Sequence, residues 1–100
     1  MRFGLIGAIA ALSLLMNAGP AVARGKAVYN ATCAACHGTG AAGAPKLGDK
    51  VAWMPRLRDL AAAKEAALNG KGFMPAKGGN SSLSKADVIA AVEYIAAQSK

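Results

Sequence analysis

The sequence predicts an all-α fold, with about four helices in one small domain. Apolar residues recur at helical spacing in separate segments, and loops rich in glycine and proline divide these segments. Residues that suit N-caps stand before the last two segments, and glycine follows the first and the third. No stretch alternates between apolar and polar residues as a half-buried strand would, and there is no internal repeat.

The first half of the domain should hold one longer helix and one short one. Residues 25–35 are expected to be helical, with one face formed by Val28, Tyr29, Thr32 and Cys33. Gly38 should end this helix, because residues 38–48 contain four glycines and Pro45 and are expected to form a loop. A short helix is expected over residues 49–53, and Trp53, the only tryptophan, should belong to the core.

The second half should hold two capped helices. Asp59 is a suitable N-cap for a helix that runs through Asn69 and stops at Gly70. Ser84 begins the pattern Ser-x-x-Asp of a capping box, with Leu83 and Val88 placed as a hydrophobic staple. The last helix has an apolar face, and its Tyr94 is expected to meet the first helix.

The first 23 residues have the pattern of a secretory signal peptide. Arg2 supplies a positive start, residues 3–16 are uncharged and apolar, and Ala21-Val22-Ala23 is a small-residue cleavage site. We therefore expect cleavage after Ala23 and a mature domain of residues 24–100. The alternative is a retained membrane anchor, but the apolar run is shorter than the about 20 residues that a spanning helix needs.

Cys33-Ala34-Ala35-Cys36-His37 has the spacing Cys-x-x-Cys-His, the attachment signature of a c-type haem. Two thiols three positions apart lie on the same side of one helical turn, so both can form thioethers with the vinyl groups of one porphyrin edge. His37 then lies close enough to the ring to bind the iron as proximal ligand. A haem would also give this small chain the additional apolar surface that a core of 77 mature residues needs.

Three other interpretations of the motif are weaker. A structural zinc site normally has four protein ligands, and this chain offers two cysteines and one histidine within five residues. A redox Cys-x-x-Cys of the thioredoxin type would need a βαβ context, which the sequence lacks. A simple disulfide would leave His37 without a role.

Two methionines of the mature chain, Met54 and Met74, are candidates for the second axial ligand. Both precede proline, and chain length alone lets either reach the iron. Met74 is favoured, because Phe73 and Met74 are out of place in a polar, glycine-rich loop unless they point inward. Met54 has an alternative role in packing beside Trp53.

The chain is basic, with a formal net charge of +7, which becomes +6 if Arg2 leaves with the signal. The lysines are scattered and the few aromatic residues are far apart, so no nucleic-acid partner is expected. A basic rim would steer the protein to redox partners with acidic docking surfaces, or to a membrane-associated oxidase or reductase. Ordinary solvated charge is the alternative. Arg56 and Arg58 are candidates to approach haem propionates.

The combination resembles the class I c-type cytochromes. The resemblance covers nearly the whole mature chain and is carried by residues 28–37, 43–49, Trp53 with Pro55-Arg56, residues 74–79 and residues 92–95. The order and spacing of these segments are most similar to the cytochrome c-five group. One departure is the stretch Asn80-Ser81-Ser82-Leu83, where members of that group often carry a second cysteine pair.

The resemblance implies a small cytochrome c fold whose helices wrap around one covalently bound haem c. It implies Cys33 and Cys36 as thioether attachments, His37 and Met74 as axial ligands, and the Pro45 carbonyl as the partner of His37. The expected function is periplasmic one-electron transfer without catalysis, because both axial positions would be filled. The alternatives are a haem enzyme or gas-binding protein with a labile sixth site, and a haem subunit of a larger oxidoreductase.

Overall fold

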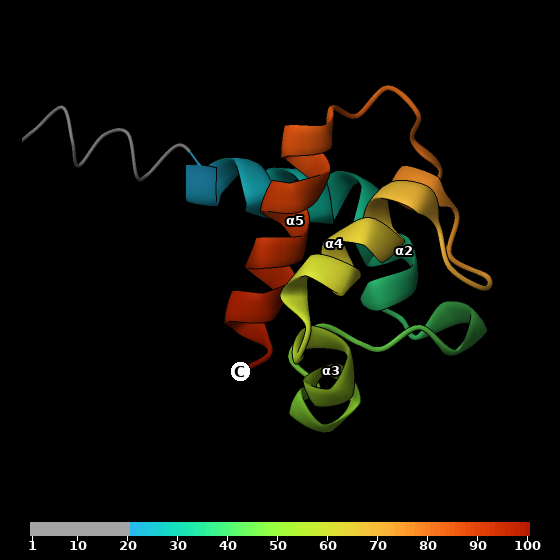
Figure 1. The fold of residues 1–100 in the computed structure, drawn as a ribbon, viewed down its shortest axis with the longest axis vertical. Coiled ribbons are helices and arrows are strands. Elements are labelled where there is room, and N and C mark those ends of the chain that lie inside the picture. The colour runs from blue at the N-terminus through green and yellow to red at the C-terminus, as the bar shows by residue number, and fades with distance from the viewer. Residues whose placement is uncertain (1–20) are drawn as a thin grey trace, which may run out of the picture.

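The computed structural model describes residues 21–100, and within them the fold is all-α, as predicted (Figure 1). This part of the chain has no β-sheet, only an isolated bridge between Lys71 and Met74. Most of the predicted signal peptide, residues 1–20, lies outside the described residues. None of the helices described is long and apolar enough to cross a membrane.

A single run of helix leads into the Cys-x-x-Cys-His segment. Residues 21–28 are α-helical, a π-helical turn (η1) covers Tyr29–Cys33, and the α-helix α2 covers Ala34–His37. The predicted helix over residues 25–35 was therefore too short at both ends, because the backbone stays helical until Gly38 donates to the Ala34 carbonyl at 2.9 Å. π-helical turns are rare in proteins, and those that occur are often at functional sites. This one ends at Cys33.

The next helix is also longer than predicted. α3 spans Lys50–Leu57, and the Asp49 side chain caps it by accepting from the Ala52 N–H at 3.2 Å. Pro55 lies inside this helix and lacks a backbone N–H, but it does not end it. Arg58 N–H still donates to the Met54 carbonyl at 3.1 Å, so the helical ladder continues past the proline.

The two remaining helices begin at their predicted caps, and α4 also ends where predicted. α4 spans Leu60–Asn69, with Asp59 as N-cap and Gly70 as its stop at φ 88°. α5 spans Lys85–Gln98, and Ser84 caps it by accepting from the Asp87 N–H at 3.1 Å. Two short 3₁₀ turns lie in the loops, η2 at Ala41–Gly43 and η3 at Ala76–Gly79.

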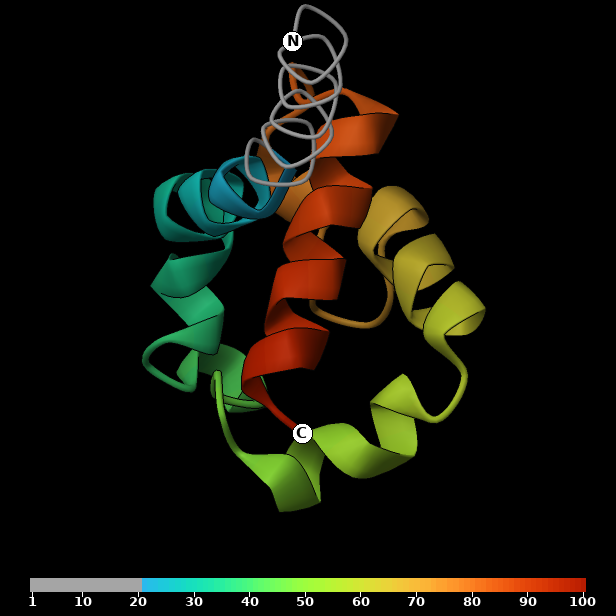
Figure 2. The ribbon, with the colours of Figure 1, turned by 90° about the vertical axis from the view of Figure 1, so that its left-hand side faces the viewer.

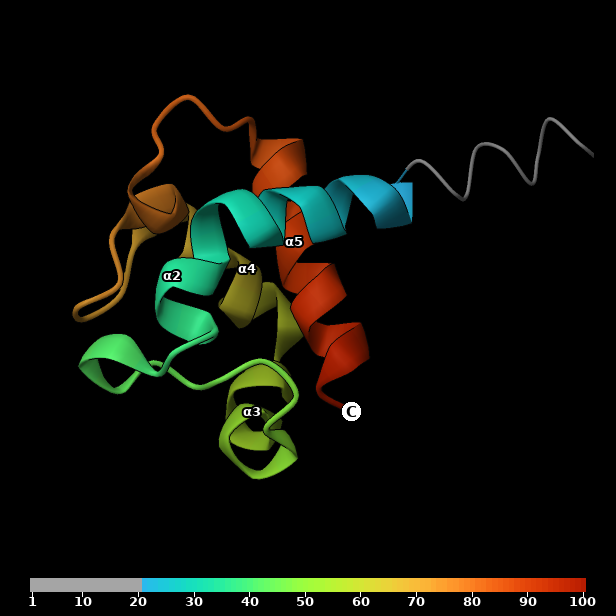
Figure 3. The same ribbon diagram turned by 180° about the vertical axis from the view of Figure 1, so that it is seen from behind.

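The two ends of the domain are joined where the N-terminal helix crosses α5 (Figures 1 and 3). Gly25 is buried at this crossing, and a Cβ there would lie only 2.5 Å from the Ala90 carbonyl oxygen. One turn further along, the rings of Tyr29 and Tyr94 pack with centroids 5.4 Å apart. The predicted contact of Tyr94 with the first helix is therefore confirmed.

The core consists of two small clusters that both use α5. Tyr29, Trp53 and Ile95 form the first, against which Cys33 packs, and Ala67, Val88 and Val92 form the second. Leu83 packs on the second cluster, as the predicted staple requires. Figure 2 shows α5 in front, the N-terminal helix and α2 to one side, α4 to the other side and α3 below.

Candidate functional site

The two cysteines lie on one helical turn and differ in exposure. Cys33 is half-buried and packs against the cluster of Tyr29, Trp53 and Ile95, while Cys36 is exposed. Both are free thiols, with no disulfide between them. Burial raises the pKa of the Cys33 thiol above its ordinary value, because a thiolate is poorly solvated there. Cys33 therefore faces the core, while Cys36 faces the solvent.

His37 is buried and held from two sides. Its Nδ1 lies 2.9 Å from the Pro45 carbonyl oxygen, and its ring packs on Trp53 with centroids 5.3 Å apart. A carbonyl oxygen can only accept, so Nδ1 carries the proton and donates it. Nε2 then keeps its lone pair and is the ring atom able to bind a metal ion. The predicted Pro45 contact is present in the structure.

The loop beside His37 is fixed by bonds that the sequence did not reveal. Trp53 Nε1 donates to the Lys46 carbonyl at 2.7 Å, and Leu47 N–H donates to the His37 carbonyl at 2.8 Å. Gly48 N–H donates to Ser99 Oγ at 2.9 Å, which ties this loop to the end of α5. With the Pro45 carbonyl, these bonds have four acceptors, and all except Ser99 Oγ are backbone carbonyls. Every residue has such a carbonyl, so the sequence does not indicate which ones accept.

Met74 is half-buried and packs on the second core cluster, with Ala67, Val88 and Val92. Its loop lies close to the cysteine-bearing helix, since a Cβ on Gly78 would come within 2.9 Å of Thr32 Cγ2. Met54, the other candidate, is 61% exposed on α3. The structure thus places the two methionines differently, one in the core and one on the surface.

The expectation that Phe73 points inward is wrong. Its side chain is 92% exposed, although Met74 beside it is packed in the core. The reason is a tight turn in which Lys71 and Met74 exchange two backbone hydrogen bonds of 2.9 and 3.0 Å. This turn places Gly72 and Phe73 at its tip.

Both arginines that were candidates to approach haem propionates are exposed at the surface. Arg56 is exposed and donates to the carbonyl of Ala52 within its own helix. Arg58 is also exposed and lines an open groove of about 600 Å³ between α3 and the end of α5, together with Lys50, Met54, Leu57, Leu60, Ala96, Ser99 and Lys100.

The loop after Met74 is closed without cysteines. Lys77 Nζ donates to the Leu83 carbonyl at 2.8 Å, and this lysine backbone is left-handed at φ 55°. Asn80 Oδ1 accepts from the Ser82 N–H at 3.2 Å. The sequence had shown that a second cysteine pair is lacking here, but not that Lys77 spans the loop.

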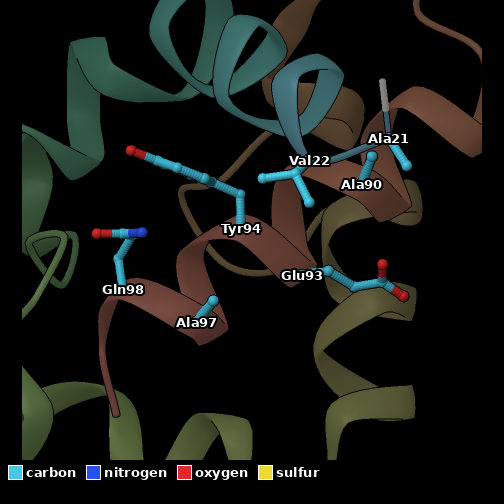
Figure 4. Close-up of a pocket in the computed structure, with 7 residues that line it drawn as sticks. All are labelled: Ala21, Val22, Ala90, Glu93, Tyr94, Ala97 and Gln98. Carbon is cyan, nitrogen blue, oxygen red and sulfur yellow. The ribbon is translucent and has the colours of Figure 1, made fainter. Parts of the chain in front are cut away.

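A smaller pocket of about 180 Å³ lies beside the helix crossing (Figure 4). Ala21 and Val22 form one wall, and the other wall comes from α5 with Ala90, Glu93, Tyr94, Ala97 and Gln98. Cleavage after Ala23 would remove the first wall. This pocket therefore cannot belong to the mature domain if the predicted cleavage takes place.

The donor set and its placement fit a haem of the c type. Cys33 packs on the first core cluster and His37 packs on Trp53 of that cluster, whereas Met74 packs on the second cluster. Two thiols, an oriented imidazole and a thioether are the donor types that a c-type haem needs.

Comparison with known proteins assigns this chain to a protein family. The family model described as "Cytochrome C oxidase, cbb3-type, subunit III" matches residues 20–95. The chain belongs to this cytochrome c family, and its relatives are monohaem class I cytochromes. The family implies a haem c cofactor.

Individual relatives of the chain are cytochromes c of bacteria. Cytochrome c-555 of Chlorobaculum tepidum is 51% identical over 83 residues, which cover 78% of this chain and 77% of the relative. Cytochrome c5 of Azotobacter vinelandii is 40% identical over 63 residues, 60% of this chain and 76% of that protein. The chain is also similar to one in a crystal structure of an electron transfer complex of nitrite reductase with cytochrome c. That likeness has a TM-score of 0.73 and 41% identity, and it covers 77% of this chain and 95% of the other.

Proposed function

We propose that this protein is a periplasmic one-electron carrier with one haem c per chain. Cys33 and Cys36 hold the haem through two thioethers, and His37 and Met74 are its axial ligands. The bound haem supplies an iron that gains or loses a single electron. The signal peptide is cleaved after Ala23, which mass spectrometry of the purified protein would test, since the mature chain should begin at Arg24.

The observation that carries the proposal is the hydrogen bond from His37 Nδ1–H to the Pro45 carbonyl, 2.9 Å long. It fixes the tautomer, orients the ring and increases the basicity of Nε2 toward a metal. Packing on Trp53 restrains the same ring from another side. An imidazole prepared in this way next to two thiols is what axial ligation in a c-type haem requires.

Met74 is the second ligand because the core holds it and Met54 is at the surface. A thioether is a soft ligand that stabilises ferrous iron, so His/Met ligation raises the reduction potential. With both axial positions filled, no substrate reaches the metal, and the protein only carries electrons. A peroxidase-like site would need a distal acid or base, and the only histidine already donates to Pro45.

Assignment as a subunit of a larger oxidoreductase is the second candidate, because the matching family model is described as an oxidase subunit. The sizes of the relatives favour the free carrier. The match to cytochrome c-555 of Chlorobaculum thiosulfatiphilum covers 96% of that protein and 78% of this chain, so the relative is itself small. Gel filtration of native extract distinguishes the two, since a free carrier elutes near its monomer mass.

The partners we propose are donor and acceptor redox proteins with acidic docking surfaces. The net charge of +7, which is +6 once Arg2 is removed with the signal peptide, supports electrostatic steering toward such surfaces. A membrane-associated oxidase or reductase is included among these partners.

The decisive experiment compares Met74→Ala with the matched variant Met54→Ala. Met74→Ala should abolish the methionine–iron absorption in the near infrared, lower the reduction potential and let carbon monoxide bind the reduced protein. Met54→Ala should leave all three properties unchanged, because Met54 is mostly exposed. Rapid and complete carbon monoxide binding by the unmodified protein at neutral pH would contradict Met74 ligation.

A further inference from the structure

Phe73 has the greatest exposure of the large apolar side chains that the structure describes, at 92%. Single apolar residues on a surface are common and need no explanation. Phe73 differs because it stands at the tip of a projecting turn, seen at the right-hand side of Figure 1 and the left-hand side of Figure 3. The residue that follows it, Met74, is packed in the core.

The turn that carries Phe73 is fixed in shape. Lys71 and Met74 exchange backbone hydrogen bonds of 2.9 and 3.0 Å across it. Gly72 has φ 59° while Phe73 does not have positive φ, the pattern of a type II′ hairpin turn. A Cβ on Gly70 would lie 3.1 Å from the Met74 carbonyl oxygen, so the base of the turn packs closely as well. The aromatic ring is thus presented by an ordered backbone, which reduces the entropy lost on binding.

In sequence, this turn lies in a stretch between Glu65 and Asp87 whose charged residues are all lysines. No Asp or Glu occurs in residues 66–86, which carry Lys71, Lys77 and Lys85, and none occurs in residues 24–48. The five carboxylates of the chain all have partners: Asp49 and Asp59 cap helices, Glu65 accepts from Asn69, Glu93 pairs with Lys64 and Asp87 with Arg24. η2 and the 71–74 turn both project away from α5 (Figures 1 and 3). An apolar tip in basic surroundings is complementary to an apolar recess with an acidic rim.

We propose that the turn of residues 71–74 is the docking element for a redox partner whose surface has an apolar recess rimmed by Asp and Glu. Phe73 inserts into the recess, and Lys71 pairs with the rim. This inference rests on the proposed carrier function. Buried aromatic residues in a polar rim are the common anchors of protein interfaces. Docking here would bring the partner within one residue of the proposed iron ligand Met74.

A protein partner fits better than a lipid surface. Membrane-surface binding usually relies on an amphipathic helix with several apolar residues facing the lipid. The turn offers one aromatic residue on a short, rigid hairpin, which suits a recess of similar size. Binding of the protein to anionic lipid vesicles is therefore measured as the second part of the test.

The experiment measures oxidation of the reduced holoprotein by two oxidants. One is the nitrite reductase of the kind that forms the complex with the structural neighbour. The other is hexacyanoferrate(III), a small anion that needs no recess. Phe73→Ala is compared with Val51→Ala, a matched control 79% exposed on α3. Lys71→Glu is compared with Lys100→Glu at the exposed end of the chain.

Phe73→Ala should lower the bimolecular rate with the reductase by about 10- to 100-fold, the range typical of an interface anchor. Lys71→Glu should slow the same reaction and weaken its dependence on salt. The two control variants should react like the unmodified protein. Oxidation by hexacyanoferrate(III), the reduction potential and the methionine–iron absorption should not change in Phe73→Ala.

The other outcomes separate the two hypotheses. Equal rates for Phe73→Ala and the unmodified protein, or no reaction with the reductase despite oxidation by hexacyanoferrate(III), would overturn the docking proposal alone. A changed potential in Phe73→Ala would also overturn it, since Phe73 would then act through Met74. Phe73-dependent binding to anionic vesicles would make the turn a membrane contact instead. If neither oxidant takes an electron, the carrier function fails and the docking proposal fails with it.

Discussion

Replacement of Gly25 by alanine sets helix propensity against packing, and the two effects have opposite signs. In an isolated helix the change favours folding by up to about 1 kcal/mol. In the folded protein the new Cβ would lie 2.5 Å from the Ala90 carbonyl oxygen and 3.3 Å from Tyr94 Cβ. The nearest atom belongs to a backbone, so the first turn of the proposed mature chain, which begins at Arg24, must move away from α5. Because real Cβ atoms essentially never come within 3.0 Å of another atom, the overpacking cost should lie in the upper part of the usual range, at about 2–3 kcal/mol, which leaves a net loss of about 1–2 kcal/mol.

Urea unfolding of the holoprotein, followed by far-ultraviolet circular dichroism, would measure this loss. In a domain of this size the same loss lowers the melting temperature by about 4–16 °C. The matched control is Lys26→Ala, an exposed position in the same helix, which should change stability by less than about 0.5 kcal/mol. Ala90→Gly should not rescue Gly25→Ala, because the contact is with a carbonyl oxygen. A Gly25→Ala protein as stable as the unmodified one, or more stable, would refute the reasoning.

Three further predictions concern the loop, the core and the cofactor. Lys77→Met removes the hydrogen bond to the Leu83 carbonyl and should lower the free energy of unfolding by about 1 kcal/mol. The control variant Lys71→Met should leave the free energy of unfolding unchanged. Equal urea midpoints for the two variants would contradict this prediction. Burial raises the pKa of Tyr29 above its ordinary 10.0, so the neutral phenol is favoured in the folded state and stability should fall as the pH rises above 10.0. Tyr29→Phe should show a shallower fall in urea titrations above that pH, and identical slopes would disprove the assignment. The mature chain without haem should be poorly folded, since its two core clusters are small; a well-dispersed amide NMR spectrum from haem-free protein would contradict this.

The sequence alone was sufficient where chemistry depends on short spacing. Cys-x-x-Cys-His, the caps at Asp59 and Ser84 and the stop at Gly70 are local patterns, and local patterns fix local structure with little help from the rest of the chain. The expectation that the Pro45 carbonyl partners His37 came from family resemblance, and the structure contains that contact.

Other predictions failed because they depended on more distant contacts or on backbone geometry. Phe73 was expected inside because apolar residues usually are, but two backbone hydrogen bonds across a hairpin turn place it at the surface. α3 was expected to end at Trp53, yet it continues through Pro55 because the hydrogen bonds on both sides of the proline remain.

By itself, then, the sequence determined the helical class, and it supplied the candidate haem-attachment motif and the candidate axial ligands, since each of these depends on the identity and spacing of a few neighbouring residues. The tertiary structure decided which atoms are available. It gave His37 a single free ring nitrogen, packed Met74 in the core while Met54 stayed on the surface, and turned Phe73 outward. Those outcomes depend on backbone carbonyls and on contacts between segments far apart in the chain, which no local pattern specifies.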